Sequence, residues 1–446
     1  MPEPAPKPQL AYCTNVHAGA SWGQTRANLE RHALAVKRIV SPDQPLGVGL
    51  WLSARSAREV IEGQRIEELR DFLHTSGLDV FTFNGFPHGD FHQPVVKKAV
   101  YTPNWTDPAR ADYTRDLIAI LARLIPEGAE GSISTLPIAW GNSTHVARAQ
   151  TTGAQLSSPA SEISNLKSVI SNLKSQISNL KSEISILNSQ IPTPPLTAAA
   201  KNLTSLAREL HVLEQETGRL IHLDLEPEPG CILDTSADVV RFFEDHLLRQ
   251  VKTEEESLIR RHLRVCHDIC HAAVMFEDQD DALRTYESAG IEVGKVQISS
   301  ALRIDFDALE DDAHKQKALE ALRSFAEDRY LHQTCVRSSP EAQPVFHEDL
   351  SDALDALKNT AAPPTGEWRT HFHIPIHIET LDPLATTQPE IAACLNSIHR
   401  RHPHARHFEI ETYAWPVLPP EHRAADLAEG VAREWIWLQR QFDAFR

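Results

Sequence analysis

Apolar and polar residues alternate strictly in the run LIHLDLEPEPG, residues 220–230. The apolar positions alternate with His222, Asp224 and Glu226, which is the period of two expected of a strand. Two prolines follow at once and exclude further ladder hydrogen bonds. The pattern therefore predicts a buried strand that ends in the carboxylate of Glu226, where the chain must turn.

Segments with the same design recur along the chain. Between them lie stretches with apolar residues at helical spacing, including 24–39, 107–125, 201–217 and 236–249. Alternation of strands and helices is typical of a parallel sheet covered by helices. We count eight strands, in LAYCTNVH, LGVGLWLS, LDVFTFNGFPHGDFH, SISTLPIAW, LIHLDLE, HLRVCHDICHAA, IEVGKVQISSALR and ARHFEIETYAW.

Eight strand–helix repeats predict one α/β domain, a (β/α)8 TIM barrel over residues 10–446. Residues 1–9 are rich in proline, and we expect them to be a disordered lead-in. After the seventh strand the alternation becomes irregular. There we expect an acidic helical stretch over 306–330, a short helix within 337–367 and one inserted extended segment, WRTHFHIPIHIETL.

A low-complexity insertion over residues 145–198 separates the fourth and fifth strands. From Ile163 to Ile191, Ile and Leu recur at alternating spacings of three and four, the seam of a short coiled coil. Ser and Asn fill the other positions, and both are mediocre helix formers. We favour a multiplied repeat that loops out without a role in function. The alternative is a homo-oligomerisation element that pairs chains through the seam.

Composition excludes several classes of protein. The 44 basic and 61 acidic residues give a net charge of −17, which disfavours nucleic acid as a partner. No apolar run approaches the roughly 18 residues of a membrane span, and the N-terminus lacks the apolar core of a signal peptide. The six cysteines are scattered without a CxxC pair, as in a reduced, cytoplasmic protein.

Carboxylates stand at the ends of several predicted strands. Glu226, Asp268 and Glu411 offer oxygen ligands, and Gln297 offers an amide oxygen. This mixture suits Mn²⁺ or Mg²⁺, whereas an added histidine such as His271 would favour Mn²⁺, Co²⁺ or Zn²⁺. Buried carboxylates must bind a cation or pair with Arg or Lys. We therefore predict a divalent-metal site at this end of the barrel.

Other polar residues near strand ends are candidates for substrate binding. Arg303 could pair with the buried carboxylates or hold an anionic group of a substrate. His373 and His377 are four apart, and we expect one of them to be functional. With 23 histidines in the chain, His222 is better explained as a core residue, and Glu228 is a second-choice ligand. Trp140 and Trp415 could stack on a sugar, although core packing explains each of them more simply. The predicted substrate-binding set is His17, Asn84, His88, His92, Arg303 and His373, of which the loop histidines suit ordinary loop hydrogen bonds about equally well.

The order of these ligands resembles the xylose isomerase-like barrel superfamily. That superfamily includes sugar isomerases, ketose epimerases, inosose-type dehydratases and endonuclease IV. The phrases LDLEPEPGC, HDICH, QISSALR, HFHIPIHIE and EIETYAW are similar, more narrowly, to EboE-type metabolite traffic proteins. The resemblance implies that Glu226, Asp268, Gln297 and Glu411 hold the metal, with His271 as an additional ligand. The epimerases usually have His where this chain has Gln297.

Three hypotheses follow for a small-molecule metabolite as the partner. The first is a metal-dependent isomerase or epimerase in which Glu226 or Glu411 moves a proton between adjacent carbons. The second is a metabolite-binding or trafficking protein without turnover. The third is a zinc nuclease like endonuclease IV, which the acidic balance and Gln297 disfavour.

Overall fold

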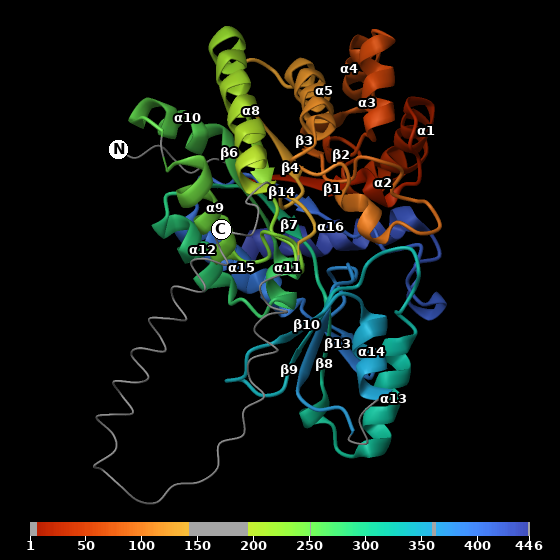
Figure 1. The fold of residues 1–446 in the computed structure, drawn as a ribbon. Helices are drawn as coiled ribbons and strands as arrows, with labels where there is room; N and C mark the ends of the chain where they lie inside the picture. Colours follow the sequence, from red (N-terminus) through yellow and green to blue (C-terminus); the bar gives the residue numbers. More distant parts are fainter. Residues whose placement is uncertain (1–6, 142–194, 250, 359–362, 445–446) are drawn as a thin grey trace, which may run out of the picture.

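The computed structural model describes residues 7–141, 195–249, 251–358 and 363–444. Eight parallel strands close into a barrel in the order β1-β14-β7-β6-β5-β4-β3-β2 (Figure 1). The predicted (β/α)8 barrel is therefore confirmed, whereas the heptad run and residues 1–6 lie outside the described residues. The strands are β1 (Gln9–Cys13), β2 (Leu46–Leu50), β3 (Leu78–Asn84), β4 (Glu130–Thr135), β5 (Leu220–Leu225), β6 (Leu263–Asp268), β7 (Val293–Ile298) and β14 (His407–Ile410).

Helices follow the strands and cover the outside of the barrel. They are α1 (Trp22–Asn28), α2 (Leu34–Val40), α3 (Ala54–Glu62), α4 (Ile66–Ser76), α5 (Pro108–Leu124), α8 (Pro195–Thr217), α9 (Ser236–Phe242), α10 (Thr253–His262), α11 (Ile269–Val274), α12 (Gln279–Ser288), α15 (Pro389–Arg401) and α16 (Leu427–Ala444). A π-helical turn continues α1 into α2, and another extends α9. The helical conformation is interrupted between α3 and α4, where Gln64 has a left-handed φ of 53°.

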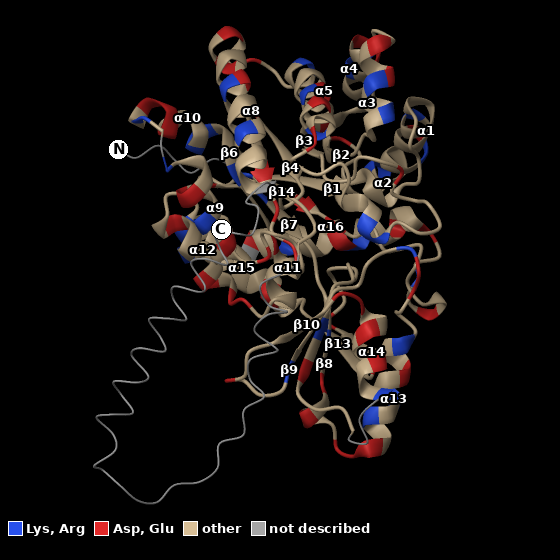
Figure 2. Ribbon diagram, viewed as in Figure 1, with Lys and Arg blue, Asp and Glu red and all other residues tan. Residues whose placement is uncertain are grey.

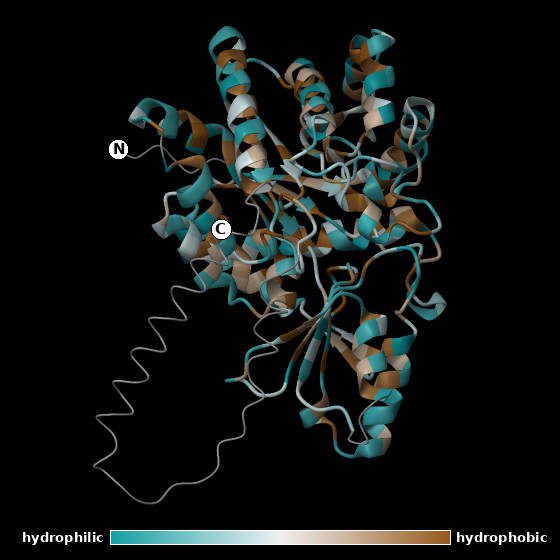
Figure 3. Ribbon diagram, in the orientation of Figure 1, coloured by the Kyte–Doolittle hydropathy of each residue, from teal (hydrophilic) through white to brown (hydrophobic). Residues whose placement is uncertain are grey.

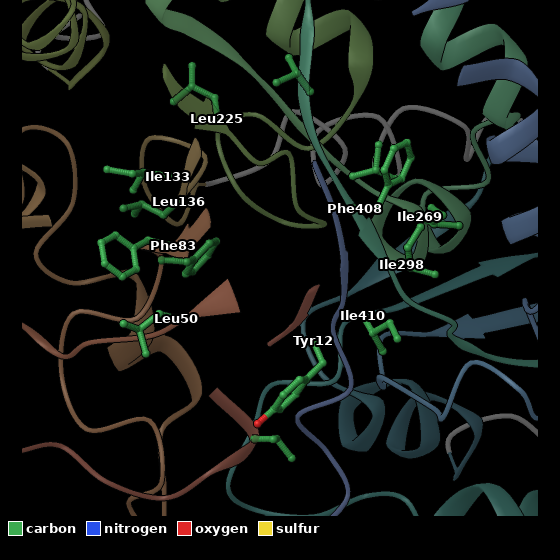
Figure 4. Close-up of a cluster of buried hydrophobic side chains, with 14 of the residues drawn as sticks. Tyr12, Leu50, Phe83, Ile133, Leu136, Leu225, Ile269, Ile298, Phe408 and Ile410 are labelled. Atoms are coloured by element: carbon green, nitrogen blue, oxygen red, sulfur yellow. The ribbon is translucent and has the colours of Figure 1, made fainter. Parts of the chain in front are cut away.

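Apolar side chains of the strands point outward into the layer between the barrel and its helices. Figure 4 shows this layer, with Leu50, Phe83, Leu225 and Ile298 on different strands, and each of these side chains is fully buried. In Figure 3 the apolar residues of the helices gather on the side that faces the strands. This layer is the hydrophobic core, because it removes the largest apolar area from water.

The inside of the barrel is unusually polar. Lys295 forms a salt bridge with Glu409, and His222 Nδ1 lies 2.6 Å from Asp224 Oδ1. All four side chains are fully buried. A Cβ on Gly49 would lie 1.7 Å from Glu409 Oε1. Glycine on β2 therefore leaves the room that this carboxylate needs.

A second sheet interrupts the barrel between β7 and α15. Its six antiparallel strands follow the order β10-β9-β11-β8-β13-β12, and with α13 (Asp312–Arg323) and α14 (Leu350–Lys358) they form a lobe below the barrel in Figure 1. The sequence patterns predicted two helical stretches here, which correspond to α13 and α14, but only one extended segment in place of the six strands. Its strands are β8 (Leu302–Asp305), β9 (Thr334–Arg337), β10 (Val345–His347), β11 (Glu367–Thr370), β12 (Thr380–Leu381) and β13 (Leu384–Thr386).

Charged residues of both signs are mixed over the outer helices and over this lobe (Figure 2). Many of them pair within one helix, as Arg26 does with Glu30. Among the described residues, no helix combines the length and the apolar character needed to cross a membrane.

Candidate metal centre

Three carboxylates meet at the C-terminal end of the barrel. Glu226 directly follows β5, Asp268 is the last residue of β6, and Glu411 directly follows β14. Parallel strands end at the same rim, so residues far apart in sequence are brought together there. One oxygen from each carboxylate lies within 4.8 Å of the other two, a spacing at which all three can contact one cation.

Burial makes this cluster electrostatically unfavourable by itself. The three residues are 2–4% exposed, and among the described residues no Lys or Arg forms an ion pair with any of them. Burial raises the pKa of Glu226 to about 8. Burial, together with the charges of Glu226 and Asp268, raises the pKa of Glu411 well above its ordinary value. Three ionised carboxylates at this spacing require a positive charge between them.

Two histidines complete the donor set. Each ring is oriented by a hydrogen bond from its Nδ1 to a backbone carbonyl. His271 Nδ1 lies 2.9 Å from the carbonyl oxygen of Pro227, and His373 Nδ1 lies 2.6 Å from that of Glu411. A carbonyl only accepts, so each Nδ1 donates, and a neutral ring then has its lone pair on Nε2. Burial lowers the pKa of His373 to about 4, whereas in His271 the charges of Asp268, Glu228 and Glu226 outweigh burial and raise the pKa. Both Nε2 atoms face Asp268 Oδ2, at 3.8 and 4.0 Å. A backbone carbonyl behind an imidazole is the usual support of a metal-binding histidine.

Asp268 is held through one of its oxygens, and the other oxygen stays free. Asp268 Oδ1 accepts from the Ser299 hydroxyl at 2.7 Å and from the backbone N–H of His271 at 3.0 Å. Asp268 Oδ2 and Glu226 Oε2 are buried, and neither has a hydrogen-bond partner within the described part of the chain. Burial alone would raise the pKa of Asp268, but His271 and His373 bring it below its ordinary value. These free oxygens and lone pairs fit a divalent cation.

Gln297, the fourth predicted ligand, lies on the next strand in register. It pairs with Asp268 of β6 on one side and with Glu409 of β14 on the other. Its side chain is fully buried, and within the described residues neither amide atom has a hydrogen-bond partner. Gln297 does not line the pocket above the carboxylates. Its role as a ligand therefore stays a prediction.

A pocket with a cavity volume of about 60 Å³ is lined by two of the three carboxylates, Glu226 and Glu411. Its lining combines polar side chains, among them Glu228, His271, His371 and His373, with aromatic ones. The loop after β3 closes one edge, since the backbone N–H groups of Val96 and Lys97 both donate to the carbonyl of Arg329 in the second lobe. The aromatic residues are Phe86, Phe91, Tyr101, Tyr330 and Tyr413.

Sequence reasoning named His373 from the second lobe but missed His371 and Gln333. His371 directly follows β11, and its Nδ1 donates to Gln333 Oε1 at 2.7 Å. Gln333 Nε2 and the Tyr101 hydroxyl both donate to Glu228 Oε1, at 2.9 and 2.8 Å. His371 alternates with His373 in HFH, and this spacing of two was the available signal.

Like His373, the predicted substrate-binding residue Asn84 lies beside the carboxylates. Its Nδ2 donates to Glu411 Oε1 at 2.7 Å, and Asn15 Nδ2 donates to the same oxygen at 3.0 Å. His92 supports this arrangement from behind, with Nε2 2.6 Å from the Asn15 carbonyl oxygen.

Other predicted residues lie away from the pocket. His17 is buried and stacks on His32 with ring centroids 4.5 Å apart, and His88 packs edge-on against Tyr113. Arg303 does not reach the carboxylates, because it lies in β8 and its Nε donates to Glu367 Oε1 at 2.8 Å.

The two tryptophans and His377 also lie outside the pocket lining. Trp415 Nε1 donates to Glu434 in the core, and Trp140 packs against Tyr101 behind the pocket wall. His377 is partly buried, and its pKa is lowered by burial and by Arg433.

Comparison with known proteins leaves the family open. No family model matches the chain, and neither does any curated protein. Solved structures similar to it include the probable 3-DHS dehydratase AsbF involved in petrobactin synthesis from Bacillus anthracis, with 10% identity, a TM-score of 0.42, and coverage of 97% of this chain and 98% of that one. A xylose isomerase-like TIM barrel protein from Mycobacterium smegmatis in complex with magnesium has 10% identity and a TM-score of 0.37, over 80% and 99% of the two chains. An L-ribulose 3-epimerase has 13% identity and a TM-score of 0.35, over 72% and 79%. These low values add nothing to what the strand pairing of the barrel already establishes.

Proposed function

We propose that the protein is a divalent-metal-dependent isomerase or epimerase of a small polyhydroxy or carbonyl-containing metabolite, built on a xylose isomerase-like barrel. The observation that carries the proposal is the meeting of Glu226, Asp268 and Glu411, buried together without a Lys or Arg partner among the described residues. Two histidine lone pairs directed at Asp268 support the same assignment.

The donor set favours a transition metal over magnesium. Glu226, Asp268 and Glu411 would hold the ion through oxygen, and His271 and His373 would add nitrogen. Mixed carboxylate and imidazole donors suit Mn²⁺, Co²⁺ or Zn²⁺. Such an ion would polarise a carbonyl or hydroxyl oxygen of the bound metabolite.

The side chains themselves would bind the substrate and move its proton. Glu226 and Glu411 extend from β5 and β14, which are separated by β6 and β7 around the barrel, so they can approach a bound molecule from different sides. Either carboxylate could accept a proton from carbon and return it to the neighbouring carbon. Asn15 and Asn84 orient Glu411 for this step through their hydrogen bonds to its Oε1.

Solvent exchange tests the proposal directly. The Mn²⁺- or Co²⁺-loaded protein would be incubated in D2O with a panel of ketoses, aldoses and inososes, and deuterium at carbons beside the carbonyl would be followed by NMR. We expect exchange with at least one compound and its loss in Glu411→Gln. Glu421→Gln, an exposed glutamate, is the matched control.

The runner-up is a metabolite-binding or trafficking protein that has kept the pocket. The resemblance to EboE-type proteins and the presence of Gln297 at the seventh strand favour it. Binding of a panel compound by the metal-loaded protein, without deuterium exchange for any of them, would support this alternative over turnover. Cleavage of an abasic DNA duplex with zinc supplied would instead support a nuclease.

A further inference from the structure

A second cluster of metal-binding side chains lies on the outside of the barrel, away from the pocket. His211 and Glu214 are three residues apart on α8, on the same side of the helix. His262 ends α10, which packs against α8 beside β5 (Figure 1). One donor atom from each of the three lies within 4.8 Å of the other two.

The orientation of His262 brings one of its ring nitrogens close to the carboxylate of Glu214. Its Nδ1 lies 2.8 Å from the carbonyl oxygen of Ile221, so Nδ1 donates and the neutral ring carries a lone pair on Nε2. That lone pair faces Glu214 Oε2 at 3.4 Å. Two acceptors in this position repel each other unless a proton or a cation lies between them.

The two histidines have no other partner for these atoms. His262 is fully buried, and its Nε2 has no hydrogen-bond partner within the described residues. The same holds for Nδ1 of His211. Glu214 is held by Arg261, whose Nε donates to Oε2 at 2.7 Å and whose Nη2 donates to Oε1. A carboxylate oxygen has two lone pairs, so this contact orients Glu214 and leaves it able to bind an ion.

We propose that His211, Glu214 and His262 bind a Zn²⁺ ion that clamps α8 to α10. Two imidazoles and one carboxylate are a common zinc donor set, with water in the fourth position. The carbonyl of Ile221 behind His262 is the support expected of a zinc-bound histidine. The site is independent of the barrel carboxylates and needs no residue of the pocket.

The test removes the barrel site first, so that the two sites cannot be confused. Asp268→Asn would be titrated with Zn²⁺ against a chromophoric chelator, and bound zinc measured by elemental analysis. We expect one zinc per chain to remain, and His211→Ala in the same background to weaken its binding by about tenfold or more. His74→Ala, an exposed histidine on α4, should leave binding unchanged.

A second readout keeps the inference falsifiable if a variant folds poorly. Co²⁺ in the Asp268→Asn protein should give the visible absorption of a tetrahedral site, and His211→Ala should abolish it. The proposal is overturned if Asp268→Asn and its His211→Ala derivative bind zinc equally. Nitrogen NMR that shows a protonated Nε2 on His262, unchanged by zinc, would overturn it as well, because a proton would then bridge His262 and Glu214.

Discussion

Asn84 donates from Nδ2 to Glu411 Oε1 at 2.7 Å, joining the end of β3 to the end of β14 across 327 positions of sequence. Asn15 donates to the same oxygen. Two neutral donors on one oxygen leave the other oxygen of Glu411 available on the side of Asp268 and His373. The two amides therefore orient the carboxylate without neutralising its charge, as residues that hydrogen-bond to a metal ligand do.

Asn84→Ala should weaken metal binding by about 10- to 100-fold, the usual cost of losing such a support. The reason is that Glu411 would rotate or take up a proton. Isothermal titration with Mn²⁺ measures the effect. Asn396→Ala, at an exposed position of α15, is the matched control. An unchanged affinity in Asn84→Ala would show that Glu411 is not a ligand.

The barrel could be predicted from the sequence because the evidence for each strand lies within a short run of residues. Period-two runs such as the one ending at Glu226 identify strands, and parallel pairing then forces their ends to one rim. Asp268 and Glu411 could be placed at that rim for the same reason. Their distances to each other could not be predicted, because these depend on barrel closure.

The second lobe was not predictable in the same way. Its strands are two to four residues long, too short for a periodic signal, and the pairings of β8 with β11 and β13 join segments far apart in sequence. His371 therefore looked like one histidine among many. Arg303 looked like a residue at a barrel strand end, whereas it lies in β8 and pairs with Glu367.

Arg303→Ala should leave kcat/KM within about twofold of wild type, since surface salt bridges away from the site contribute little. His373→Ala should lower both metal affinity and kcat/KM, because it removes a lone pair directed at Asp268. Measuring kcat/KM and metal content for both variants tests these two expectations. A loss of activity in Arg303→Ala with metal retained would restore a role for this arginine in substrate binding.

The stability of the metal-free protein should fall as pH rises from about 5 to 8. Burial raises the pKa of Glu226 from 4.5 to about 8, so the folded protein holds a proton that the unfolded chain has already lost. The stabilisation that this proton gives is fully present below the pKa of Glu226 in the unfolded chain. It is lost as the pH rises through the pKa of Glu226 in the folded protein. One such group contributes at most about 1.4 kcal/mol per pH unit.

Urea denaturation in EDTA at several pH values measures this slope. Glu226→Gln should flatten it, because the amide does not titrate. Saturating Mn²⁺ should reverse it, since metal displaces the proton and binds more tightly at higher pH. A metal-free protein whose stability rises steadily to pH 8 would contradict the assignment of Glu226 as a protonated buried carboxyl.

Lys295→Met should destabilise the fold by about 3–5 kcal/mol, because it leaves Glu409 buried without its partner. Both side chains are fully buried inside the barrel, and Glu409 raises the pKa of Lys295 although burial alone would lower it. The double variant Lys295→Met with Glu409→Gln should recover part of the loss, since an amide costs less to bury than a carboxylate. Urea denaturation of the three proteins, with metal present, gives the free energies of unfolding. If Lys295→Met were as stable as wild type, the pairing of Lys295 with Glu409 would contribute nothing to the stability of the barrel interior.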